Sequence, residues 1–215
     1  GGKGMKFDRF NNYVVIQHSD GTLGNYSHLK KGGVTVRPGD TVAEGQLIAS
    51  VLSKKIAAGS THVVIDIPVG STAKVRTLQS AQALSLGLTT VGETFGLRIK
   101  VVPTDGLQPV GRGIGPALEA MDVLSILKCD PTAPDDLRHR AVLLAGALLE
   151  LAGAAPGGEG EAMAKQALDS GRAWRKFQRI CEAQGGMRTP PKSRQQRPLL
   201  AQQHGLVSAI DNRRI

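Results

Sequence analysis

Aromatic residues make up only 3% of this 215-residue sequence. No stretch approaches the roughly eighteen consecutive apolar residues of a membrane-spanning helix. The first thirty residues also lack the basic start and continuous apolar core of a signal peptide. The sequence therefore predicts no membrane segment and no export signal, and we expect a cytoplasmic protein with no membrane partner.

Cysteine is scarce as well, with only Cys129 and Cys181. They form no CxxC pair and have no histidine at ligand spacing, which argues against a structural zinc site and against a disulfide framework. We expect both to be reduced and buried as small apolar side chains, and we expect no bound metal.

The net charge of +9 is unevenly distributed. Residues 1–58 carry eight Lys/Arg and four Asp/Glu, residues 186–215 carry six and one, and the intervening body is neutral. Few aromatic residues are available for base stacking, and no nucleic-acid-binding motif is present. We expect no nucleic-acid partner. The basic stretch 188–197 is interpreted as a solvated loop, with a phosphate-binding arm as the alternative.

The first fifty residues read as short β-strands. YVVIQ at 13–17, the turn SDGT and LGNYSHL predict a hairpin. Another strand is expected at 33–36, and RPGD at 37–40 predicts a tight turn.

From Ser50 the pattern changes to alternating helices and strands. LSKKIAAG predicts a helix end with Gly59 as its cap, and HVVIDIPVG reads as a strand covered on both faces. A helix at 77–95 and a strand at 97–102 complete a βαβ unit with parallel pairing. Further helices are expected at 116–128, 135–152, 160–169 and 172–184, and a strand at 205–210.

Two of these helices have apolar stripes that we expect to face the core. The first comprises Leu137, Ala141, Leu144, Leu148 and Leu151, and the second Trp174, Phe177 and Cys181. GRGIG at 111–115 matches no complete phosphate-loop or dinucleotide fingerprint. It is interpreted as a bend before a helix, with an anion site as the alternative.

The segment YVVIQHSDGTLGNYSHLKKGGVTVRPGDTVAEGQLIA resembles the lysostaphin-type (M23) zinc peptidases over residues 6–49. The resemblance places His28 at the active-site histidine of the family's Y-x-H-L motif. The family's metal ligands come from an H-x-x-x-D segment before this region and an H-x-H segment after it. Neither is found in these places, and because a catalytic zinc needs about three protein ligands, peptidase activity is not expected.

Residues 50–215 resemble the thymidine and AMP phosphorylases through SVLSKKIAAGSTHVVIDIPVGSTAKVRT, VVPTDGLQPVGRGIGPALEAMDVL and LDSGRAWRKFQRICEAQGG. The family cleaves a nucleoside's glycosidic bond with inorganic phosphate as co-substrate and without another cofactor. Its S-x-x-S-K pattern implies that Ser50 and Lys54 hold the base. The family's phosphate-binding loop and upstream arginine have no counterpart in the 215 residues.

The predicted fold is α/β, a βαβ sheet flanked by helices, with a small N-terminal all-β hairpin module. The predicted domains are residues 1–49 and 50–215. The resemblance implies a pentosyltransferase of the nucleoside phosphorylase type, incomplete and inactive as this chain, with nucleoside or nucleotide and phosphate as ligands and a possible homodimer. The alternatives are a non-catalytic cell-wall peptidase-like module and a fusion product without a selected function.

Overall fold

The computed structural model describes the backbone of residues 12–17 and 23–29, and residues 52–212 and 214 in full. The expected strand at 33–36, the turn at 37–40 and the boundary between residues 49 and 50 lie outside these residues. The chain divides into two compact units, Gly1–Ser60 and Thr61–Ile215.

The first unit contains the predicted hairpin. Strands β1 (Asn12–Gln17) and β2 (Leu23–Leu29) pair antiparallel, with Val15 opposite Asn25 and Gln17 opposite Leu23. A short helix at residues 52–57 follows later in this unit. Both elements confirm the expectations from the sequence.

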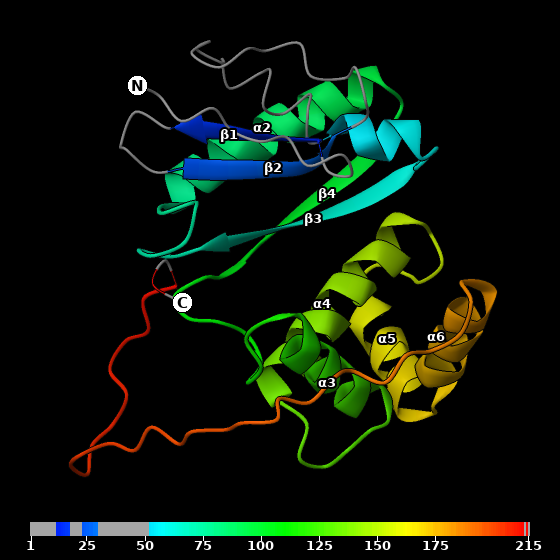
Figure 1. Ribbon diagram of the computed structural model, residues 1–215. Helices are drawn as coiled ribbons and strands as arrows, with labels where there is room; N and C mark the ends of the chain where they lie inside the picture. Colours follow the sequence, from blue (N-terminus) through cyan, green and yellow to red (C-terminus); the bar gives the residue numbers. More distant parts are fainter. Residues whose placement is uncertain (1–11, 18–22, 30–51, 213, 215) are drawn as a thin grey trace. The chain divides into compact units, whose positions relative to one another are not determined.

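The second unit begins with the predicted βαβ arrangement (Figure 1). Strand β3 (His62–Val69), helix α2 (Leu78–Thr94) and strand β4 (Arg98–Asp105) follow one another, and the two strands pair in parallel. The Thr77 hydroxyl accepts a hydrogen bond from the Ser80 amide and begins α2, as N-cap threonines do. Gly96, with a φ of +73°, ends the helix.

Helices cover both faces of this sheet. Successive side chains of a strand point to opposite faces, so the contacts of neighbouring residues show which helix lies on each face. On one face, Ile99 lies against Gly92 of α2. On the other, Asp66 and Lys100 form ion pairs with α4 (Asp135–Leu151). The prediction of a strand covered on both faces is confirmed, and the α4 side carries ion pairs.

Helix α4 also packs against α5 (Gly160–Asp169), which is followed by α6 (Arg172–Ala183); α3 (Pro116–Leu127) precedes α4. The predicted leucine stripe of α4 is not its buried face. Leu148 is 42% exposed, and the buried residues are Gly146 and Ala147. Helix α4 contacts the sheet and α5 through other faces. Periodicity alone therefore predicted the wrong buried face.

Three further expectations are corrected in the described part of the chain. Residues 205–210 form no strand, and Leu206 and Val207 are 98% and 82% exposed; without a neighbouring strand, an extended segment has no hydrogen-bonding partner. Cys129 and Cys181 are free, but Cys129 is exposed and Cys181 only half-buried. The α6 stripe is half-buried, and no residue of α6 is buried.

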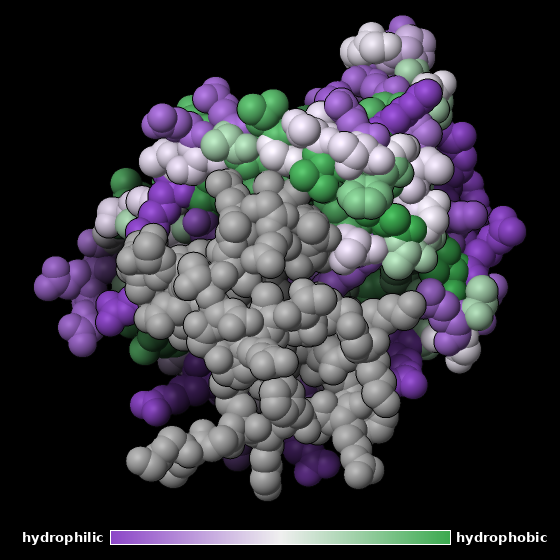
Figure 2. Space-filling model, turned by 90° about the horizontal axis from the view of Figure 1, so that it is seen from above, coloured by the Kyte–Doolittle hydropathy of each residue, from purple (hydrophilic) through white to green (hydrophobic). Residues whose placement is uncertain are grey.

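Apolar side chains also reach the surface at Leu78 and Leu86 of α2 and at Phe95, which follows the helix. Figure 2 shows apolar residues among hydrophilic ones on one face of the molecule. In the residues that the structure describes, no helix is long and apolar enough to cross a membrane.

Candidate functional site

The helix at residues 52–57 holds Lys54 and is fixed at both ends. Leu52 is fully buried. At the other end Gly59 has a φ of +71° and donates to the Ile56 carbonyl at 2.9 Å, while Ser60 donates to the Lys55 carbonyl at 2.9 Å. These two bonds form a Schellman motif. The predicted glycine cap is confirmed, and Lys54 is held half-buried on a closed helical turn.

The other two predicted site residues are Ser50 and His28. Ser50 lies outside the described residues, so its separation from Lys54 stays a prediction. His28 lies in strand β2, where the structure describes only the backbone.

The glycine-rich loop at residues 111–115 is not an open anion site. The Asp122 carboxylate accepts from the amides of Arg112 and Gly113, both at 2.7 Å, and Asp136 accepts from Gly111 at 3.0 Å. Because carboxylates of the same chain already bind these amides, the loop offers no unpaired amide cluster to a phosphate. Sequence analysis missed both carboxylates, since they lie on α3 and α4, distant in sequence from the amides they bind.

A second polar cluster joins the sheet to α4. The Asp66 carboxylate accepts from the Thr104 hydroxyl at 2.5 Å and pairs with Arg140 Nη1 at 3.4 Å, and Arg140 Nη2 donates to the Asp105 carbonyl at 2.5 Å. The Arg140 side chain is only 16% exposed. Asp66 thus binds both a hydroxyl and a guanidinium group. The cluster serves to hold α4 on the sheet.

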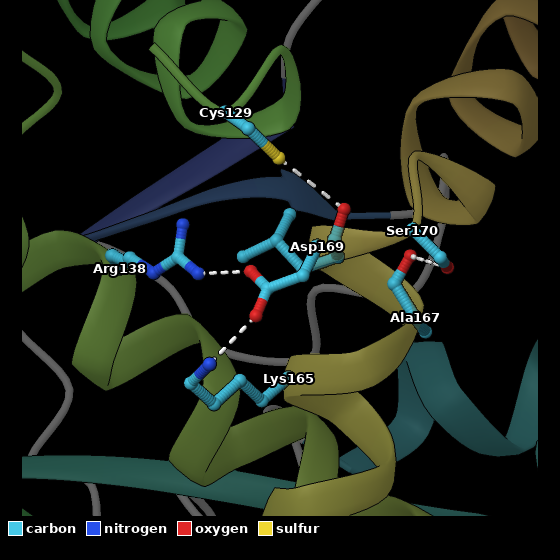
Figure 3. Close-up of polar contacts among 7 residues, drawn as sticks. Cys129, Arg138, Lys165, Ala167, Asp169 and Ser170 are labelled. Carbon is cyan, nitrogen blue, oxygen red and sulfur yellow. Dashed lines mark hydrogen bonds and ion pairs between the residues drawn. The ribbon is translucent and has the colours of Figure 1, made fainter. Parts of the chain in front are cut away.

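A third cluster surrounds Asp169 at the end of α5 (Figure 3). Its carboxylate pairs with Lys165 of the same helix and with Arg138 of α4. These hydrogen bonds, Lys165 first and Arg138 second, hold the pKa of Asp169 below its usual value. Cys129 donates to the Leu168 carbonyl at 3.4 Å. This cluster links α4 and α5.

The zinc that a lysostaphin-type peptidase requires does not fit these residues. The described part of the chain has no group of three His, Cys, Asp or Glu side chains placed to hold a metal. His62 and Asp66 have H-x-x-x-D spacing, but four residues of a strand span about 13 Å, and Asp66 is bound to Thr104 and Arg140.

Comparison with known proteins finds two similarities. Residues 3–76 match the model of peptidase family M23. Curated relatives named putative thymidine phosphorylase match most of the chain: 56% identity over 82% of it for Cupriavidus necator, 60% over 83% for Polaromonas, and 53% over 94% for Sphingopyxis alaskensis. Both resemblances seen in the sequence are confirmed.

The chain spans about a third of the length of these relatives, between 34% and 40%. The 176 residues matched in the Cupriavidus necator protein are more than residues 50–215 contain. The phosphorylase similarity therefore extends to residues before Ser50, and it overlaps the M23 match, which reaches residue 76. Where one domain ends and the other begins stays a prediction.

Proposed function

We propose that this chain carries the base-binding part of a nucleoside phosphorylase, starting from its 53–60% identity to putative thymidine phosphorylases over at least 82% of its length. The reaction transfers a ribosyl or deoxyribosyl group from a pyrimidine nucleoside or AMP to inorganic phosphate. No other cofactor is proposed, and a homodimer is the proposed assembly.

Lys54 and Ser50 are proposed to hold the base. Negative charge develops on the base as the glycosidic bond breaks, and fixed donors that meet this charge lower the barrier. The Gly59 cap supports this role for Lys54, since it closes the helix on which Lys54 lies. Ser50 precedes Lys54 by about one helical turn, which puts both on one face if the helix extends that far.

The phosphate end of the site is proposed to be incomplete in these 215 residues. The glycine-rich loop at residues 111–115, for which the sequence left an anion site as the alternative, has its amides bound to Asp122 and Asp136. Holding two reactants in the correct relative orientation can lower the activation free energy of a reaction by roughly 7–11 kcal/mol. A chain that holds only the base loses most of that, so we expect no phosphorolysis by this chain alone.

Base binding tests the proposal. Titration of thymine, uracil and adenine into the protein, followed by calorimetry or NMR, should give saturable binding of at least one base. Lys54→Ala should weaken that binding by more than tenfold, because the loss of a charged donor costs about 1.5–3 kcal/mol. Lys55→Ala is the matched control, since it removes an equal charge from the next residue and should leave binding unchanged. Equal losses in the two variants would contradict the proposal.

Activity is tested separately as phosphate- or arsenate-dependent release of free base from thymidine, uridine and AMP. No release is expected at high protein concentration. Release that disappears in Lys54→Ala would support the base site and contradict the proposed inactivity.

The match of residues 3–76 to peptidase family M23 favours a second candidate. In this alternative the N-terminal residues form a non-catalytic module that binds cell-wall peptides. Co-sedimentation with purified peptidoglycan tests it, with His28→Ala as the variant. Sedimentation that His28→Ala abolishes, without any base binding, would favour this candidate over the phosphorylase.

A further inference from the structure

Helix α6 carries four exposed cations along one face: Arg172, Arg175, Lys176 and Arg179. Their positions i, i+3, i+4 and i+7 place them side by side on a helix. We call these four residues the α6 basic stripe. Its two ends lie about 10 Å apart along the helix axis, at 1.5 Å per residue.

The α6 basic stripe lowers the stability of the helix that carries it. Cations are disfavoured in the first turn of a helix, where the dipole is positive, yet Arg172 and Arg175 lie there and no acidic residue does. Like charges three or four positions apart also repel one another by a few tenths of a kcal/mol per pair.

Within the described residues, none of the four stripe cations forms a recorded ion pair with a carboxylate. The ion pairs of that part use Lys100, Arg138, Arg140 and Lys165. Within the stripe, the recorded contact is from Arg175 Nη1 to the Ser170 carbonyl, at 3.4 Å. The stripe is therefore a row of cations that an external anion can reach.

The opposite face of α6 is occupied by the protein itself. Trp174 stacks on Phe177 with ring centroids 6.1 Å apart, and the Lys128 ammonium lies 5.2 Å from the Trp174 ring centroid. A membrane-surface helix inserts its apolar face into lipid, and that face is half-buried here. Protein partners are usually anchored by exposed aromatic or apolar side chains, and the stripe contains none.

We infer that the α6 basic stripe binds the phosphodiester backbone of duplex nucleic acid, independently of base sequence. Arginine, three of the four residues, matches phosphate oxygens with its planar donor fork. Backbone contacts of this kind need no aromatic platform. The expectation of no nucleic-acid partner rested on missing aromatic residues and motifs, which bear on reading the bases. That expectation also rested on the zero net charge of residues 59–185. A net charge of zero does not exclude a row of cations on one helix.

Fluorescence anisotropy with a labelled 20-base-pair DNA duplex tests this inference on the full chain. With four phosphate contacts, log K should fall with log salt at a slope of about −3.6, or roughly a hundredfold between 50 and 200 mM. Changing all four stripe residues to glutamine should remove most of that slope. Glutamine has nearly the helix propensity of arginine and lysine, so circular dichroism should be unchanged and Tm equal or higher.

The matched control changes four exposed cations of the irregular tail and removes the same net charge: Arg188→Gln, Lys192→Gln, Arg194→Gln and Arg197→Gln. This variant should retain most of the wild-type affinity and slope. If the two variants lost equal affinity for the duplex, net charge alone would explain the binding, and the inference would be overturned. The absence of duplex binding, or tighter binding to polyglutamate or to phosphatidylserine vesicles than to the duplex, would also overturn it.

Discussion

Gly146 and Gly160 let the backbones of α4 and α5 approach one another directly. A Cβ added at Gly146 would lie 2.5 Å from the Glu161 amide nitrogen and 2.8 Å from the Gly160 carbonyl carbon. Both atoms belong to backbone, so neither can move aside by a change of rotamer. The close approach of the two helices therefore depends on the missing side chain.

We expect Gly146→Ala to destabilise the protein by about 1–3 kcal/mol, the usual range for overpacking, even though alanine is the better helix former. Chemical denaturation measures this. Gly157→Ala is the control, since a Cβ there meets nothing within 4 Å, and it should be neutral or slightly stabilising. A Gly146→Ala protein as stable as the wild type would show that the helices are not in contact here.

At the scale of the elements, Glu150 connects α4, α5 and β4. It lies on α4, its Oε1 accepts from the amides of Gly158 and Gly160 ahead of and at the start of α5, and its Oε2 pairs with Lys100 of β4 at 3.3 Å. The hydrogen bond from the Gly160 amide, followed by the one from Lys100, lowers the pKa of Glu150 below its usual value.

A carboxyl group whose pKa is lower in the folded state contributes stability above its unfolded pKa. That contribution is lost as the pH falls through the folded value. We therefore expect Glu150→Gln to be less stable than the wild type at pH 7 and the difference to shrink below about pH 4. Urea denaturation over a pH series checks this. Glu93→Gln, at an exposed position of α2, should have a smaller effect, and a pH-independent difference for Glu150→Gln would contradict the account.

Across the whole molecule, packed helices contrast with a long irregular tail. Residues 185–212 form no helix or strand, whereas α4 is closely packed and its Arg138 and Arg140 pair with Asp169 and Asp66. Proteases cut exposed irregular backbone first. Trypsin should therefore cut at residues 188–197 before it cuts within α4, as mass spectrometry over time would measure. First cuts at Arg138 or Arg140 would mean that α4 is not stably packed.

Helix ends and the parallel strand pair could be predicted from the sequence because their signals are local. Thr77 begins α2, Gly96 ends it, Gly59 closes the helix of Lys54, and Ser170-Gly171 separates α5 from α6. Each of these depends on the conformational preference of one or two residues, which neighbouring elements do not override. The S-x-x-S-K pattern predicts Ser50 and Lys54 as base-binding residues, and this stays a prediction.

Other features depend on which elements meet, and local sequence does not contain that information. The leucines of α4 have helical periodicity, but contact with the sheet and α5 decides that Gly146 and Ala147 are buried instead. The loop at 111–115 is interpreted from its sequence as a bend before a helix with an anion site as the alternative, and the sequence does not indicate that Asp122 and Asp136 bind its amides. From β3 to α6 the order of helices and strands could be predicted from the sequence, since local preferences set it, whereas the strand expected at 205–210 does not form. Tertiary structure alone decided which face is buried and which polar groups are already bound, because both depend on residues distant along the chain.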